Sequence, residues 1–152
     1  MDRSELSDLP GFTLGDSAEL SRQLVGLVRS GKKTATCEAL RAYEHQEVPL
    51  PVVGQHYVIL NWDKTPAVIV ETESVECVAF QDVQAEFALA EGENETLEEW
   101  RLDHAAYFER NGGFSPDMIL VCERFHVIGE GLSTSHESKT FQKLTHSASG
   151  DV

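Results

Sequence analysis

The order of the predicted elements favours a single domain with an α+β or barrel arrangement. Helical periodicity precedes residue 31, β-like runs fill residues 56–80, and two further helices lead into a last strand. Strands and helices do not alternate in βαβ order, so a parallel sheet is not expected. A chain of 152 residues can form one core without disulfides or metals.

The first helix is predicted to begin at Asp16, which can cap it with Glu19 three residues later. The apolar face of this helix then carries Leu20, Leu24, Leu27 and Val28. Gly31 follows as the residue that permits a left-handed exit from the helix.

The middle of the chain is predicted to contain a hairpin. Leu40 to Gln46 is interpreted as a short helical or turn segment, and Pro49 to Gly54 as an extended connection. The first hairpin strand runs from His56 to Trp62, turn residues follow through Pro66, and the second strand continues from Ala67. This second strand extends toward Phe80.

Two helices and a strand are predicted to complete the domain. Asp82 to Ala90 is a short helix, and the capping box Thr96-Leu97-Glu98-Glu99 opens a longer one through Arg110. On the longer helix one apolar stripe holds Trp100, His104, Tyr107 and Phe108. We favour a stripe that faces the core, with His104 hydrogen-bonded at its edge, over a base-stacking platform. Met118 to Ile128 is the last strand.

Charge argues against a broad contact with a polyanion. The chain has 12 Lys and Arg against 26 Asp and Glu, for a net charge of -14. An RNA partner would therefore be recognised in a local pocket, with a shallow dependence of affinity on salt.

A cytoplasmic protein without a membrane contact is predicted. The segment Met1-Asp2-Arg3-Ser4-Glu5 is too polar for a signal peptide, and no apolar run approaches the roughly 20 residues of a membrane helix. Three cysteines without metal-ligand spacing are interpreted as buried free thiols: Cys37, Cys77 and Cys122. We place the domain at residues 1–130 and a flexible or disordered tail at 131–152, which is poor in large apolar residues.

The segment Gly31-Lys32-Lys33-Thr34-Ala35-Thr36-Cys37 holds two ammonium groups and two hydroxyls just beyond a helix end. Such a set can hold a phosphate or activate a nucleophile. The alternative is that both lysines only complement the negative end of the helix dipole.

With these residues in view, the chain resembles the ASCH (activating signal cointegrator homology) family over residues 11–128. The segment Gly31 to Thr36 fits the family's G-x-K-x-x-T element. Ala90 to Arg101 with His104, and Phe114 to Met118 before the last strand, supply two further elements in the expected order.

The resemblance implies a small PUA-like β-barrel, mixed or antiparallel, with flanking α-helices around a cleft for RNA or a modified nucleoside. Some members are amidohydrolases acting on N4-acetylcytidine, and others are ribonucleases. Carried over from the amidohydrolase, the catalytic residues are Lys33, Thr36 and Glu93. Four further residues of the matching elements are predicted to bind substrate: Gly31, Lys32, Thr34 and Ser115.

Amide hydrolysis suits these side chains. We expect a desolvated Lys33 with a lowered pKa to take the proton of Thr36, whose oxygen attacks the acetyl carbonyl. Glu93 would orient Lys33 or relay the proton to the leaving amine. Lys33 and Thr36 are three residues apart, so a regular strand would point them to opposite faces and the segment must bend. Cys37 is a weaker candidate nucleophile because its neighbours suggest burial.

Two alternatives remain open at this point. In a ribonuclease, Lys33 would stabilise the phosphorane and Glu93 would activate the 2′-hydroxyl. A non-catalytic RNA or nucleotide reader would use the same cleft without turnover. No cofactor and no metal are predicted, because the histidines are dispersed. Glu93 also lies in a run of glutamates that would otherwise be interpreted as a solvated face.

Overall fold

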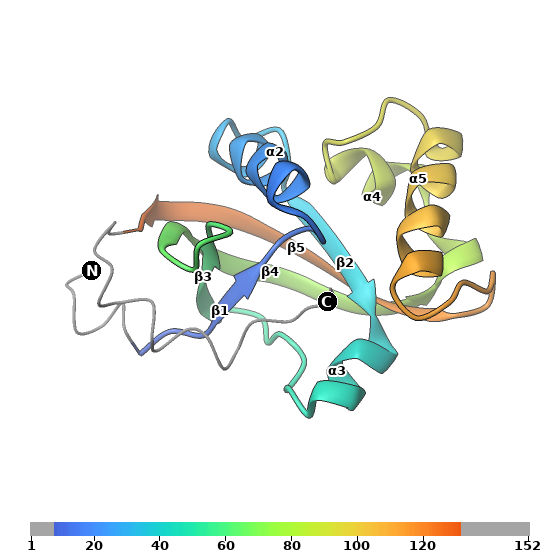
Figure 1. Cartoon of the computed structure of the whole chain (residues 1–152), viewed down its shortest axis with the longest axis horizontal. Coiled ribbons are helices and arrows are strands. Elements are labelled where there is room, and N and C mark those ends of the chain that lie inside the picture. Colours follow the sequence, from blue (N-terminus) through green and yellow to red (C-terminus); the bar gives the residue numbers. More distant parts are fainter. Residues whose placement is uncertain (1–7, 132–152) are drawn as a thin grey trace.

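A five-stranded sheet in the order β1-β3-β4-β5-β2 organises the part of the chain that the computed structural model describes, residues 8–131 (Figure 1). β1 pairs with β3 in parallel and the other neighbours are antiparallel. The strand bounds are β1 Gly11–Thr13, β2 Ala35–Ala39, β3 His56–Leu60, β4 Pro66–Ala79 and β5 Ile119–Glu130.

Four α-helices and one 3-10 turn pack on this sheet. They are α2 Ala18–Arg29, α3 Leu40–Gln46, η1 Phe80–Asp82, α4 Ala85–Ala90 and α5 Leu97–Arg110. The predicted capping residue of α2 is wrong: the Ser17 side chain accepts the hydrogen bond from Leu20 N. Asp16 instead pairs with Arg110 at the end of α5, at 2.6 Å between Oδ2 and Nε. This ion pair joins the start of α2 to the end of α5.

The α+β prediction is confirmed, but the predicted closed barrel is wrong. In the described residues β1 and β2 are the two edges of one open sheet. β1 is only three residues long, and β2 packs against α5, where the Tyr107 hydroxyl donates to Glu38. A three-residue edge strand offers little backbone for closing the sheet.

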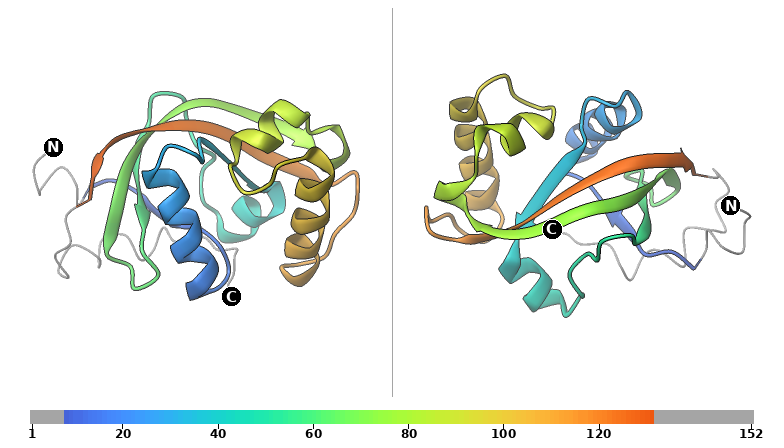
Figure 2. Two further views of the ribbon diagram at one scale, coloured as in Figure 1. Left: turned by 90° about the horizontal axis from the view of Figure 1, so that it is seen from above. Right: turned by 180° about the vertical axis from the view of Figure 1, so that it is seen from behind.

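Two larger apolar cores lie along the long β4–β5 ribbon, and a third, smaller cluster joins Val58 and Leu60 of β3 to Ile69 of β4. One core joins α2 to the first half of β4, and the other joins α4, α5 and η1 to β2 and the start of β5. Register shifts between Ile69 and Val70, and between Thr72 and Ser74, interrupt the β4–β5 pairing between the two cores. The ribbon curves in Figure 2, and α2 and the α4–α5 pair lie on either side of β2 in Figure 1. Lys33 and Thr36 line a cavity that Tyr57 of the first core and Cys37, beside the second, also line.

The apolar stripe of α5 faces the core of the domain. Trp100, His104 and Phe108 are buried and Tyr107 is half-buried against the same core, so the core-facing stripe is confirmed. Trp100 is 0% exposed and has no face for a base. Burial of all three cysteines is wrong, because Cys77 is exposed on β4. No helix within residues 8–131 is long and apolar enough to cross a membrane. The predicted tail, apart from residue 131, lies outside the described residues.

Candidate active site

The turn between α2 and β2 brings Lys33 and Thr36 to the same cavity. Gly31 has φ +82°, and the amides of Lys32 and Lys33 both donate to the Leu27 carbonyl oxygen at 3.0 Å. β2 begins only at Ala35, so Lys33 precedes the regular strand. Both side chains line one cavity, and the bend required by their spacing is present.

Lys33 is a buried cation between two carboxylates. Its side chain is 1% exposed, and Nζ lies 2.6 Å from Glu93 Oε2 and 3.1 Å from Glu91 Oε1. Nζ also lies 3.4 Å from the Glu91 carbonyl oxygen. A buried ammonium group is tolerated only when it is paired and hydrogen-bonded, and these three acceptors satisfy that condition.

The expected lowering of the Lys33 pKa is wrong. Burial opposes the charged form, but the Glu93 and Glu91 carboxylates outweigh it and raise the pKa of Lys33 above its ordinary value. Lys33 is therefore an ammonium group in the free protein. It can donate hydrogen bonds to a developing negative charge, but it cannot accept a proton from Thr36.

Glu91 is the residue that the sequence analysis missed. It is 1% exposed, and its Oε2 accepts from Trp100 Nε1 at 3.2 Å. Burial alone would raise the pKa of Glu91, but Lys33 and His104 lower it well below its usual value. The carboxylate is therefore ionised throughout the neutral range. In sequence Glu91 stands in the same glutamate run as Glu93, with nothing local to mark it.

Gly92 sets the spacing between the two glutamates and the lysine. It has φ +76°, and a Cβ at this position would lie 2.4 Å from the Lys32 carbonyl oxygen. Only glycine permits both this conformation and this close approach of the two backbones. The Thr34 amide donates to the Ala90 carbonyl oxygen at 2.8 Å, and this hydrogen bond holds the same two backbone segments together.

His104 and Cys37 complete the buried cluster. His104 Nδ1 lies 2.9 Å from the Trp100 carbonyl oxygen, which can only accept, so Nδ1 carries a proton. Its Nε2 lies 3.5 Å from Glu91 Oε1. Burial alone would lower the pKa of His104, but Glu91 raises it above its ordinary value. Burial and Glu91 raise the pKa of the Cys37 thiol, which argues against Cys37 as a nucleophile.

The cavity between the two cores has a volume of about 340 Å³. Small-molecule sites typically enclose roughly 300–1,000 Å³, so this one suits a single small ligand. Lys33, Thr36 and Glu93 all line it. Within residues 8–131 the Thr36 side chain makes no hydrogen bond, which leaves its hydroxyl available to a ligand.

Two protonatable carboxyl groups stand on the strands of the cavity wall. Burial raises the pKa of Glu38 to about 7, although Ala39 N and the Tyr107 hydroxyl donate to it. Burial likewise raises the pKa of Glu123 to about 7. Glu123 is the cross-strand neighbour of Thr36. At neutral pH each of these groups can therefore donate or accept a hydrogen bond.

The four predicted substrate-binding residues do not line the cavity that the described residues form. Gly31, Lys32 and Thr34 are exposed on the outer side of the turn, and the Thr34 hydroxyl donates to the Ala90 carbonyl oxygen at 3.3 Å. Ser115 is exposed before β5, where its hydroxyl donates to Asp117 at 2.6 Å. Their binding role stays a prediction.

A family model identifies the domain. The model described as ASCH domain matches residues 12–129, which is most of the chain. The chain belongs to the ASCH domain family. ASCH domains are generally RNA-binding. A search of curated proteins found no match for this ASCH domain.

Solved structures agree with this assignment. Protein EF3133 from Enterococcus faecalis V583 is 38% identical with a TM-score of 0.73, covering 80% of this ASCH domain chain and 77% of its own. The ASCH domain from Lactobacillus crispatus JV V101 is 28% identical with a TM-score of 0.72, covering 82% of each chain. ASCH from Zymomonas mobilis, at 12% identity and a TM-score of 0.51, covers 82% of this chain and 73% of its own. The last likeness shows the fold alone.

Proposed function

We propose that this ASCH domain is an amidohydrolase that removes the acetyl group from a modified nucleoside such as N4-acetylcytidine. The observation that carries the proposal is the buried Lys33 ammonium, held by Glu91 and Glu93, in a cavity that also presents the Thr36 hydroxyl. A fixed cation, a carboxylate and a hydroxyl around one small cavity are the groups that acyl transfer requires.

Because the pKa of Lys33 is raised, we propose Glu93 as the group that transfers the proton. Thr36 Oγ1 attacks the acetyl carbonyl carbon while its proton passes to the Glu93 carboxylate, and the Lys33 ammonium donates to the oxyanion. Glu93 then returns the proton to the departing amine as the C–N bond breaks. Water then attacks the acetyl-Thr36 ester and gives a proton to Glu93. Glu93 passes this proton to Thr36 Oγ1 as the ester bond breaks, which restores the hydroxyl and the carboxylate and releases acetic acid, which ionises to acetate.

The charge of the cavity favours a neutral nucleoside over RNA. Five acidic side chains line it: Glu38, Glu91, Glu93, Asp103 and Glu123. Among the described lining residues, the cations Lys33 and Arg110 are already ion-paired, with Glu91 and Glu93 and with Asp16 respectively. A phosphate group would therefore meet no unpaired cation in the cavity, whereas a nucleobase offers hydrogen-bond donors to the carboxyl groups.

Chromatography of the products of N4-acetylcytidine tests the proposal. We expect cytidine and acetate from the wild-type protein, and a kcat/KM lower by roughly 10²- to 10⁴-fold in Glu93→Gln, since a positioned general base contributes about that much. Glu95→Gln is the matched control, because Glu95 is exposed on the same loop.

Two other outcomes would overturn the amidohydrolase. Cleavage of labelled single-stranded RNA without cytidine formation would establish the ribonuclease. Binding of nucleoside or RNA without any product would establish a non-catalytic reader.

A further inference from the structure

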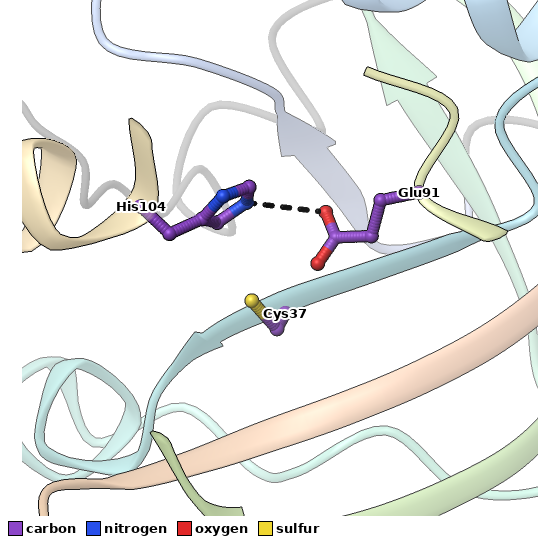
Figure 3. A group of neighbouring side chains, drawn as sticks. All are labelled: Cys37, Glu91 and His104. Atoms are coloured by element: carbon purple, nitrogen blue, oxygen red, sulfur yellow. Dashed lines mark ion pairs between the residues drawn. The ribbon is translucent and has the colours of Figure 1, made fainter. Parts of the chain in front are cut away.

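Three donor atoms of different chemistry converge beside Lys33. The Cys37 sulfur, a Glu91 carboxylate oxygen and a His104 ring nitrogen all lie within 4.8 Å of one another. They come from β2, from the loop after α4 and from α5, and Figure 3 shows the three side chains directed toward one point. All three residues also line the cavity.

Thiolate, imidazole and carboxylate are the ligands of Zn²⁺, which binds them at about 2.0–2.3 Å. In a tetrahedral site such ligand atoms are roughly 3.3–3.8 Å apart, so small side-chain rotations bring the three donors to a common ion. A site with three protein ligands leaves a fourth position open. Because all three residues line the cavity, we place that open position on the cavity side.

The groups behind two of the three donors, His104 and Glu91, already orient them. His104 Nδ1 donates to the Trp100 carbonyl oxygen at 2.9 Å and thereby directs Nε2 toward Glu91. Trp100 Nε1 donates to Glu91 Oε2 at 3.2 Å, so the second carboxylate oxygen is fixed as well. Residues that bind a metal usually make such hydrogen bonds through the atoms that do not touch the ion, and these bonds orient the ligands.

The charge of the buried cluster also accommodates a divalent ion. Cys37 would bind as a thiolate and His104 through Nε2, so the thiolate and the Glu91 carboxylate would together offset the two positive charges of Zn²⁺. Lys33 shares Glu91 Oε1 at 3.1 Å but is held more closely by Glu93, at 2.6 Å. The lysine can therefore keep one carboxylate partner while Glu91 turns to the ion.

We propose that Cys37, Glu91 and His104 form a binding site for a Zn²⁺-class divalent ion at the wall of the cavity. The site does not depend on the hydrolase reaction. Its occupancy is coupled to Lys33 through the shared carboxylate oxygen.

Co²⁺ is the probe, because a thiolate bound to it gives a charge-transfer absorption that oxygen and nitrogen ligands do not give. We expect the full chain, purified under reducing conditions, to develop this absorption with one equivalent of Co²⁺ and to lose it when Zn²⁺ is added. Cys37→Ser should abolish the absorption. Cys77→Ser should leave it unchanged, since Cys77 is an exposed thiol on another strand.

Trp100→Phe keeps an aromatic ring but removes the donor to Glu91, and should weaken Co²⁺ binding roughly 10- to 100-fold. If circular dichroism shows that Cys37→Ser is unfolded, Co²⁺ binding by Trp100→Phe tests the site instead. No thiolate absorption in the wild type with excess Co²⁺ would overturn the site, as would its persistence in Cys37→Ser. Binding without that absorption would place the ion elsewhere, for example at His56, Glu71 and His126 on the surface.

Discussion

At the scale of single residues, the site is defined by charge. Lys33 is buried with its two carboxylate partners, and Glu91 has three donors around its two oxygens. In such a network the removal of one partner leaves a charge buried and unpaired, which typically costs about 3–5 kcal/mol. Glu93→Gln also removes a charge, but it keeps a hydrogen-bond acceptor of the same size beside Lys33, which stays paired with Glu91, so it reports on catalysis more cleanly than an alanine variant.

Glu123 makes stability depend on pH. Thr72 Oγ1 donates to its carboxyl at 2.8 Å, and burial raises the pKa from 4.5 to about 7. Between these values the folded protein keeps a proton that the unfolded chain loses, so the free energy of unfolding falls as pH rises. Glu123→Gln removes this loss and should raise the free energy of unfolding at pH 8 by on the order of 1–3 kcal/mol.

Urea denaturation at pH 5 and pH 8 measures this effect. The variant and the wild type should differ little at pH 5, where the carboxyl is protonated in the folded state. Glu98→Gln, at an exposed helix position, serves as the control. If the free energy of unfolding changed between pH 5 and pH 8 by the same amount in Glu123→Gln as in the wild type, the proposed buried proton on Glu123 would be contradicted.

At the scale of elements, two turns that are distant in sequence determine the site. Residues 91–93 after α4 lie against residues 32–34 after α2, with Gly92 at the closest approach. Because the loops touch through their backbones, the distance from Lys33 to both glutamates is set by the fold. Neither turn alone would position the ammonium group.

Substitution of Gly92 tests this contact. Gly92→Ala forces a left-handed alanine, which costs roughly 1–2 kcal/mol, and also brings Cβ to 2.4 Å from the Lys32 carbonyl oxygen. We expect the free energy of unfolding to fall by more than about 2 kcal/mol. Gly26→Ala is the matched control, because Gly26 lies in α2 with nothing within 4 Å of an added Cβ.

In denaturant titrations, Gly26→Ala should gain about 0.5–1 kcal/mol from helix propensity. Equal effects of the two variants would show that the loops are not in the contact described. Hydrolysis by Gly92→Ala should fall as well, since Lys33 and the glutamates would separate.

Elements with local sequence signals were predicted, whereas features that depend on long-range contacts were not. The capping box at Thr96 and the stop after Arg110 predicted α5 to the residue, because caps and period are local. β1 was not predicted, since three residues carry no period. Glu91 was not recognised because its role depends on contacts with Lys33, Trp100 and His104. The same long-range packing reverses the expected pKa shift of Lys33.

At the scale of the whole molecule, the net charge of -14 opposes any extended contact with RNA. Binding that relies on phosphate contacts weakens steeply as salt rises, since counterions are released. We expect any affinity of this protein for single-stranded RNA to change less than about tenfold between 50 and 200 mM salt. Fluorescence anisotropy with a labelled oligonucleotide measures it, and a loss of about 10³-fold would contradict a local site.

The most direct test of the central claim compares cytidine release from N4-acetylcytidine by wild type, Thr36→Val and Thr36→Ser. Hydrolysis by wild type, its loss in the valine variant and partial activity in the serine variant would show that the hydroxyl in the Lys33 cavity performs the reaction. Full activity of a folded Thr36→Val protein, or no cytidine from the wild type, would contradict this account.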